Sequence, residues 1–160
     1  MTEENIDFLI EKMKSMSLIY HPSNKHLDYS TDDINNLPFR KGEIHPPYSY
    51  IYFLKSRMEF SGPVDFPIDI SYLACINSSE TAHELTFECD FSVREKFFFS
   101  EHQGYIVWFF KEDGAVYRFG EDTEREEKLY SSFEEFLEFM MLFALSARSK
   151  RLAERERKNF

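Results

Sequence analysis

The stretch Gly104-Tyr-Ile-Val-Trp-Phe-Phe110, with Lys111-Glu-Asp-Gly114 and Ala115-Val-Tyr-Arg-Phe119 after it, decides the fold of this chain. The first seven residues are nearly all β-branched or aromatic, and such side chains fit a pleated, half-buried surface. An Asp-Gly pair between two apolar runs indicates a hairpin turn, because glycine adopts positive φ without steric cost. The returning run alternates between two faces. The sequence therefore predicts two antiparallel strands joined by a tight turn.

An amphipathic helix is expected soon after this hairpin. Ser132 and Glu135 have the spacing of a capping box, in which each side chain accepts a hydrogen bond from the other residue's backbone amide. The apolar residues that recur at helical spacing are Phe133, Phe136, Leu137, Met140, Met141 and Ala144. Phe139, Leu142 and Phe143 widen the apolar arc, so the helix either packs deeply on the sheet or covers two surfaces. We favour packing on the sheet.

Further helices are expected in the first third of the chain. The first begins near Thr2, which is placed to cap it, and has acidic residues in its first turn, where the helix dipole favours them. Its apolar stripe is Ile6, Leu9, Ile10 and Met13. A single helical turn is expected over residues 31–37. Residues 48–54 fit both a strand and a helix, and the preceding proline favours a helix from Pro47 to Phe60.

The middle of the chain predicts strands. Ile68 to Ile76 is an apolar run, and Asn77 to Glu80 reads as a turn. Apolar and polar residues alternate from Glu84 to Phe91. The residues expected on the inner face are Leu85, Phe87, Cys89 and Phe91. A further strand is expected from Arg94 to Ser100.

These elements predict a single α+β domain. Strands grouped together with helices at both ends favour a central antiparallel sheet of about five strands, flanked by N-terminal helices and a C-terminal amphipathic helix. A length of 160 residues suits one domain with a core of its own. We assign residues 1–146 to this domain and residues 147–160 to a basic helical tail.

The charge of the chain is acidic and uneven. The formal net charge is −10, yet residues 147–160 hold six basic and two acidic side chains, so the remainder carries −14. A body of this charge repels nucleic acid and anionic membranes and favours basic partners. We expect a basic protein partner, no nucleic acid and no membrane. Solubility alone would also account for the charge, and the oligomeric state does not follow from the sequence.

No motif points to catalysis or to a cofactor. Five glycines are scattered singly, so there is no phosphate-binding loop. Cys75 and Cys89 form no Cys-x-x-Cys pair, and we expect two buried free thiols in a reducing compartment. The spacing of His21 and His26 matches no compact metal-ligand pair. We expect a non-enzymatic protein without metal or cofactor and, since no signal peptide or membrane-spanning run is visible, a cytoplasmic one.

Two short motifs resemble those of the SUKH superfamily, small proteins of which many serve as immunity proteins against bacterial toxins. One motif is a proline pair followed by tyrosine and then Phe-Leu, and the other is a closing Ser-Phe-x-x-Phe-Leu helix. The matching residues here are Pro46, Pro47, Tyr48, Phe53, Leu54, Ser132, Phe133, Phe136 and Leu137. The resemblance implies an α+β fold and a cytoplasmic protein that binds and neutralises a cognate toxin, often a nuclease.

An acidic contact surface fits that implied function, because the active-site cleft of a nuclease is basic. Such an inhibitor would associate fast and lose association rate as salt is added. The residues that we expect to form the contact surface are Glu112, Asp113, Glu121, Asp122, Glu124, Glu126 and Glu127, on the hairpin and the following loop. A loop that is merely solvated explains these residues equally well.

Two different functions also fit the sequence. One is a protein-interaction adaptor or homodimer that uses the aromatic helix at residues 48–53 or the wide apolar face of the C-terminal helix. It would expose an apolar patch and bind with weak dependence on salt. The other is an enzyme whose site forms only in the fold, since catalytic residues need not be neighbours in sequence.

Overall fold

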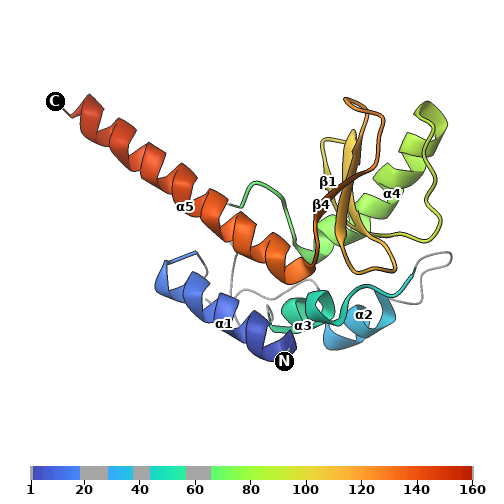
Figure 1. Cartoon of the computed structure of the whole chain (residues 1–160), viewed down its shortest axis with the longest axis horizontal. Helices are drawn as coiled ribbons and strands as arrows, with labels where there is room; N and C mark the ends of the chain where they lie inside the picture. The colour runs from blue at the N-terminus through green and yellow to red at the C-terminus, as the bar shows by residue number, and fades with distance from the viewer. Residues whose placement is uncertain (1, 19–28, 38–43, 57–65, 160) are drawn as a thin grey trace.

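The structure of the chain is a computed structural model, which describes residues 2–18, 29–37, 44–56 and 66–159. Its elements in chain order are α1 (Thr2–Ser15), α2 (Thr31–Asn36), α3 (Tyr48–Ser56), α4 (Tyr72–Glu88), β1 (Phe97–His102), β2 (Ile106–Phe110), β3 (Val116–Gly120), β4 (Glu127–Tyr130) and α5 (Phe133–Lys158). Figure 1 shows α1, α2 and α3 in one layer and the sheet with α4 in another. The expected α+β class is confirmed.

The described sheet has four strands in the order β1-β2-β3-β4, where about five were expected. Each strand is antiparallel to its neighbour. The hairpin is confirmed, because Phe110 lies opposite Val116 and Gly114 in the turn has a φ of 75°. The loop expected after the hairpin is short, since β4 begins at Glu127.

Helices cover both faces of the sheet, which explains why β2 reads as a continuous apolar run. On one face, Tyr50 of α3 is the centre of an aromatic cluster. Its ring centroid lies 5.3 Å from that of Phe110 in β2 and 5.3 Å from that of Phe133 in α5. Phe97 and Phe99 of β1 join the same cluster. This face therefore binds the first layer of helices and α5 to the sheet.

The other face of the sheet packs against α4 and the segment that follows it. Phe91 stacks on Phe119 of β3 with ring centroids 4.2 Å apart, and also contacts Phe98 and Phe109. Ala82 and Leu85 of α4 belong to this second core, together with Val107. The two cores lie on opposite faces of the sheet.

The prediction of strands and a turn over residues 68–91 is wrong, because this segment contains α4. The buried residues of α4 are Ala74, Cys75, Ser78, Thr81, Ala82 and Leu85. They recur at helical spacing, but small and hydroxyl-bearing side chains dominate among them, so the apolar pattern of the helix is weak in the sequence. The Ser71 hydroxyl caps the helix by accepting a hydrogen bond from the Ala74 amide at 3.1 Å.

The inner face predicted for residues 84–91 is half confirmed. Leu85 and Phe91 are buried, whereas Phe87 is 89% exposed and Cys89 is half-buried. At 3.6 residues per turn, side chains two positions apart point to different sides of a helix, so one helical face cannot hold all four. Cys89 and Cys75 are both free thiols, as expected, although only Cys75 is buried.

The helices predicted in the first third are confirmed. The stripe of Ile6, Leu9, Ile10 and Met13 is buried. α1 and α3 lie side by side, joined by hydrogen bonds from the Tyr48 hydroxyl to Glu3 and from the Tyr52 hydroxyl to Asp7, the latter at 2.7 Å. α3 ends at Ser56, and the rest of the helix expected to reach Phe60 lies outside the described residues.

α5 begins as predicted and is longer than any other described element. Ser132 caps it, because its hydroxyl accepts a hydrogen bond from the Glu135 amide at 3.1 Å. The Glu135 carboxylate accepts from the amide of Ser131, one residue before the cap. The predicted apolar face of α5 is buried, but Phe139, Leu142 and Phe143 remain exposed.

The second half of α5 leaves the body of the protein (Figure 1). The last residue of α5 that is hydrogen-bonded to the first layer is Arg148, whose guanidinium donates to the carbonyls of two residues in the turn after α1, Met16 at 2.7 Å and Ser17 at 3.3 Å. Side chains from Ser149 to Asn159 are exposed. We name residues 149–158 the arm. Among the described helices, none combines the length and the apolar composition needed to cross a membrane.

Candidate functional site

Five of the seven acidic residues that were expected to form one contact surface lie at the two ends of β3, and the other two, Glu126 and Glu127, lie at the start of β4, where Glu127 pairs with Arg118 in the middle of β3. Glu112 and Asp113 are in the turn before this strand, and Glu121, Asp122 and Glu124 are in the turn after it. At about 3.3 Å per residue, five residues separate the two turns by roughly 16 Å. The seven residues therefore do not form one compact site, and each end has to be described separately.

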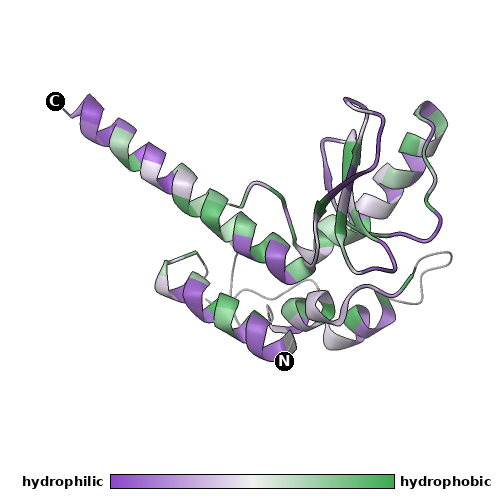
Figure 2. Ribbon diagram, viewed as in Figure 1, coloured by the Kyte–Doolittle hydropathy of each residue, from purple (hydrophilic) through white to green (hydrophobic). Residues whose placement is uncertain are grey.

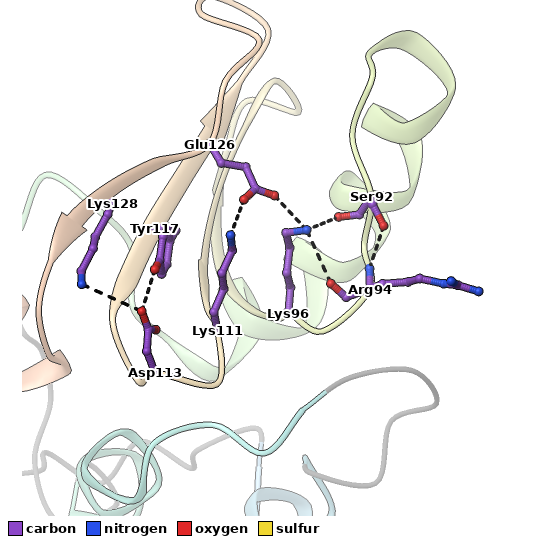
Figure 3. Close-up of polar contacts among 8 residues, drawn as sticks. All are labelled: Ser92, Arg94, Lys96, Lys111, Asp113, Tyr117, Glu126 and Lys128. Carbon is purple, nitrogen blue, oxygen red and sulfur yellow. Dashed lines mark hydrogen bonds and ion pairs between the residues drawn. The ribbon is translucent and has the colours of Figure 1, made fainter.

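At the hairpin end, Asp113 is held within the fold (Figure 3). Its carboxylate accepts hydrogen bonds from the Tyr117 hydroxyl at 2.6 Å and from the Ala115 amide at 3.0 Å, and Lys128 lies 3.9 Å away. The hydrogen bond from Tyr117 lowers the pKa of Asp113. The same bond, with burial and the Asp113 charge adding to it, raises the pKa of Tyr117 to about 12. Asp113 is thus a structural group.

Glu126 lies between two lysines on the α4 side of the sheet (Figure 3). Its two carboxylate oxygens are 2.8 Å from the Lys96 ammonium and 2.5 Å from the Lys111 ammonium. Burial alone would raise the pKa of Glu126, but the hydrogen bonds from Lys111 and Lys96 outweigh burial and lower it. The carboxylate therefore stays ionised and joins the start of β1, the end of β2 and the approach to β4.

Lys96 is buried, which is uncommon for a lysine unless it is paired. Besides Glu126, its ammonium donates to the carbonyl of Ser92 at 2.7 Å. It also lies 5.3 Å from the ring centroid of Phe91 and 5.6 Å from that of Phe109. Glu126 is consequently the counter-ion of a cation inside the second core, and its charge is already neutralised.

Asp122 is neutralised in a similar way. Its carboxylate is 2.8 Å from the Arg118 guanidinium, and this hydrogen bond lowers the pKa of Asp122. With Asp113 and Glu126, three of the expected contact residues are held by cations of the same chain. The remaining four are Glu112, Glu121, Glu124 and Glu127.

The turn after β3 holds carboxylates that no cation neutralises. Glu121 lies beside Glu88 at the end of α4, and the hydrogen bond that a protonated Glu121 can donate to Glu88, then burial and the charges of Glu88 and Glu124, raise the pKa of Glu121. Glu124 has a φ of 50°, which is uncommon for a residue other than glycine. Within the described part of the chain, no ion pair joins any of these three glutamates to a lysine or arginine.

Two more residues lie at this end of the molecule. Phe87, next to Glu88 in α4, is 89% exposed. Cys89 follows at the helix end, where burial and the charges of Glu124 and Glu121 raise the pKa of its thiol. A thiol with a raised pKa stays protonated at neutral pH and is a poor nucleophile. We name Phe87, Glu88, Glu121 and Glu124 the turn cluster.

Sequence patterns alone predicted only half of the turn cluster. Glu121 and Glu124 were among the expected contact residues, whereas Glu88 was placed on the outer face of a strand and Phe87 on its inner face. The helical spacing of small residues from Ala74 to Leu85 was the available signal. A helix there would have ended near Glu88 and brought it to the end of the sheet.

The aromatic helix at residues 48–53 offers less surface than an adaptor would need. Tyr50 and Phe53 are fully buried, and only Tyr48 is strongly exposed. Beside this helix, a groove of about 500 Å³ between α1 and α3 is lined mainly by polar and charged side chains such as Asp7 and Lys55. No apolar pocket of the kind that small ligands favour is evident there.

Within the described ranges, no three His, Cys, Asp or Glu side chains are close enough to hold a metal ion. His21 and His26 lie outside these ranges. Comparison with protein-family models, with curated proteins and with solved structures finds no match to this chain. The features of this chain that bear on its function are therefore the turn cluster and the charge of the body.

Proposed function

We propose that this chain is a non-enzymatic binding protein whose turn cluster contacts a basic protein partner. The observation that carries the proposal is the crowding of Glu88, Glu121 and Glu124, which pair with no cation among the described residues, next to the exposed Phe87. A lysine or arginine of a partner would relieve the repulsion among the carboxylates. Phe87 would supply the apolar contact that often dominates binding energy at an interface.

The charge of the whole body supports the same proposal. Outside the basic tail the chain carries −14, so a basic partner would be steered towards it and would associate faster at low salt. The surface that we propose to touch the partner is smaller than the acidic region that produces this electrostatic field. Asp113, Asp122 and Glu126 contribute to the field but are held by cations of the chain, so they are not the contact residues that we propose.

The resemblance to the SUKH superfamily extends the proposal to a class of partner. By this extension the partner is a toxin domain, and an acidic surface suits a nuclease, whose cleft must be basic to hold phosphates. The chain would neutralise the toxin by occluding that cleft. The extension depends on the resemblance, whereas binding of a basic protein through the turn cluster depends on the geometry above.

The test is capture of a partner by the immobilised whole chain from a native lysate, at low and at high salt. The site variant is Glu88→Gln/Glu121→Gln/Glu124→Gln. The matched control is Glu4→Gln/Glu11→Gln/Glu80→Gln, which removes the same number of charges from exposed positions elsewhere. We expect wild type and control to retain one basic protein that salt releases, and the site variant to lose it.

Two further measurements separate the parts of the proposal. Phe87→Ser should weaken the affinity for the captured protein by about tenfold or more, because loss of an aromatic anchor typically costs at least ~1.4 kcal/mol. Adding the whole chain should abolish the enzymatic activity of that protein if it is a toxin. A partner that the site variant retains would contradict the turn cluster, and no basic partner at either salt would contradict the binding function.

A further inference from the structure

The outer face of α5 carries large apolar side chains that the described chain covers only in part, since Tyr130 of β4 contacts Phe139 with ring centroids 5.3 Å apart. Leu142 is 52% exposed, and Phe139 and Phe143 are exposed to a similar degree. Phe139 and Leu142 lie on the side of the helix opposite the buried Leu137 and Ala144, and Phe143 lies towards the edge of this side, close to the direction of Phe136. An exposed cluster of this kind on one helix face marks an interaction surface.

The same face continues along the arm with small side chains. One turn after Leu142 comes Ser146, and further turns bring Ser149 and Ala153. All three are exposed. The face thus has large side chains on the half nearest the body and small ones on the arm. If a second α5 helix packs on it in the opposite direction, the large side chains of each helix meet the small ones of the other.

The charges of α5 favour the same arrangement. Its first two turns contain Glu134, Glu135 and Glu138. The arm and the residue before it carry Arg148, Lys150, Arg151, Arg155, Arg157 and Lys158, against two glutamates. Figure 2 shows the change from mixed hydropathy near the body to a hydrophilic end. An antiparallel pair would place each basic arm over the acidic turns of its partner, whereas a parallel pair would bring like charges together.

We propose that a second copy of this chain covers the outer face, with the two α5 helices antiparallel and crossing at Ser146. In this register Leu142 lies opposite Lys150 of the second copy, beside its Ser149, and Phe139 lies opposite its Ala153. Glu135 faces Arg157 of the second copy. Because the twofold axis passes through Ser146, every contact occurs twice.

Pairing would also account for the arm itself. Side chains from Ser149 to Asn159 are exposed on all sides of the helix. A helix without tertiary packing gains little stability from propensity alone, and a segment of this length is marginal in water. A second copy supplies the missing packing to both arms. Nucleic acid would match the charge of the arm but not the apolar side chains of Phe139 and Leu142.

The first test is the mass of the whole chain in solution, measured by sedimentation equilibrium over a wide concentration range. We expect a dimer for wild type. Leu142→Glu should weaken dimerisation by about a hundredfold or more, because each dimer would lose two buried leucines. The matched control is Leu152→Glu. Leu152 is 54% exposed but points about a third of a turn away from Ser146.

The second test fixes the register by a disulfide. In a Cys89→Ser background, where the remaining native thiol, Cys75, is buried, Ser146→Cys should cross-link two copies on mild oxidation. Ala147→Cys, one residue further and about 100° around the helix, should cross-link far less.

Circular dichroism should show that all four variants keep the helical content of wild type. A monomer at every concentration would overturn the proposal and leave the face to a different partner. A dimer that Leu142→Glu does not weaken, or equal cross-linking by the two cysteine variants, would overturn the proposed pairing. The surface is separate from the turn cluster, so neither result bears on the capture experiment.

Discussion

Two acidic regions of the sheet, one paired with cations and one crowded, contain the same kinds of side chain in opposite surroundings. In the paired region, Glu126 lies between Lys96 and Lys111, which lower its pKa. In the crowded region, Glu121 lies beside Glu88 and Glu124, which raise its pKa. The comparison shows that a count of acidic residues does not identify a binding surface. What matters is whether the fold already supplies the counter-ion.

The difference also separates stability from function. A carboxylate held by two cations stabilises the native state, and this role needs no partner to explain it. Three crowded carboxylates reduce stability, and natural proteins accept such costs most often at functional sites. Stability measured in both regions of the sheet therefore tests the comparison.

The largest effect is expected in the paired region, for Glu126→Gln. Removing one partner of a buried ion pair typically costs about 3–5 kcal/mol, because the other charge is left buried. Glu126 is partly exposed, which reduces this cost, so we expect a loss of about 2 kcal/mol in the free energy of unfolding. Urea unfolding of wild type and variant, with unchanged m-values, checks this value.

The pH dependence supplies the control for this prediction. Because the folded pKa of Glu126 is depressed, its contribution to stability is present above the ordinary carboxyl pKa of 4.5 and is lost as the pH falls through the lower folded value. The difference between wild type and Glu126→Gln should therefore shrink on acidification. A difference that is the same in acid and at neutral pH would contradict an electrostatic role.

The fold was predictable from sequence where the pattern of large apolar side chains was strong. The β2–β3 hairpin, the cap and buried face of α5, and the stripe of α1 were all predicted. α4 was not, because small residues such as Ala74, Ser78 and Ala82 form its buried face. Small side chains allow a helix to pack closely on a sheet, but they carry little hydrophobic signal.

A smaller effect is expected for Tyr117→Phe, which removes the hydrogen bond to Asp113 in the paired region. We expect a loss of about 1 kcal/mol, the usual net value of such a bond at a partly exposed position. The raised pKa of Tyr117, about 12, means that this contribution is complete below the ordinary phenol pKa of 10 and is lost as the pH rises towards 12.

Unfolding measured at neutral and at strongly alkaline pH distinguishes this explanation from simple packing. The stability difference between wild type and Tyr117→Phe should be constant up to about pH 10 and should then decline. A difference that does not change with pH would indicate that the ring environment, and not the hydrogen bond, is responsible.

The candidate site was only partly predictable for a different reason. The acidic composition of residues 121–127 is visible in the sequence, but the sequence does not show which of these residues meets a cation. Lys96 precedes Glu126 by 30 residues and Glu88 precedes Glu121 by 33. Only the pairing of all four strands and the packing of α4 on the sheet bring these groups together.

The smallest effect, and the one of opposite sign, is expected in the crowded region for Glu121→Gln. Its raised pKa means that folding disfavours the ionised carboxylate, so wild type is penalised at neutral pH and the penalty disappears below the ordinary carboxyl pKa of 4.5. Glu121→Gln should therefore raise the melting temperature slightly at neutral pH and leave it unchanged in acid. Glu112→Gln, exposed at the other end of β3, should give no such increase.

If Glu121→Gln instead lowers stability at neutral pH, the glutamates of the turn cluster support one another within the fold. That result would contradict the proposal that these glutamates bind a cation of a partner, although they are exposed and three in number.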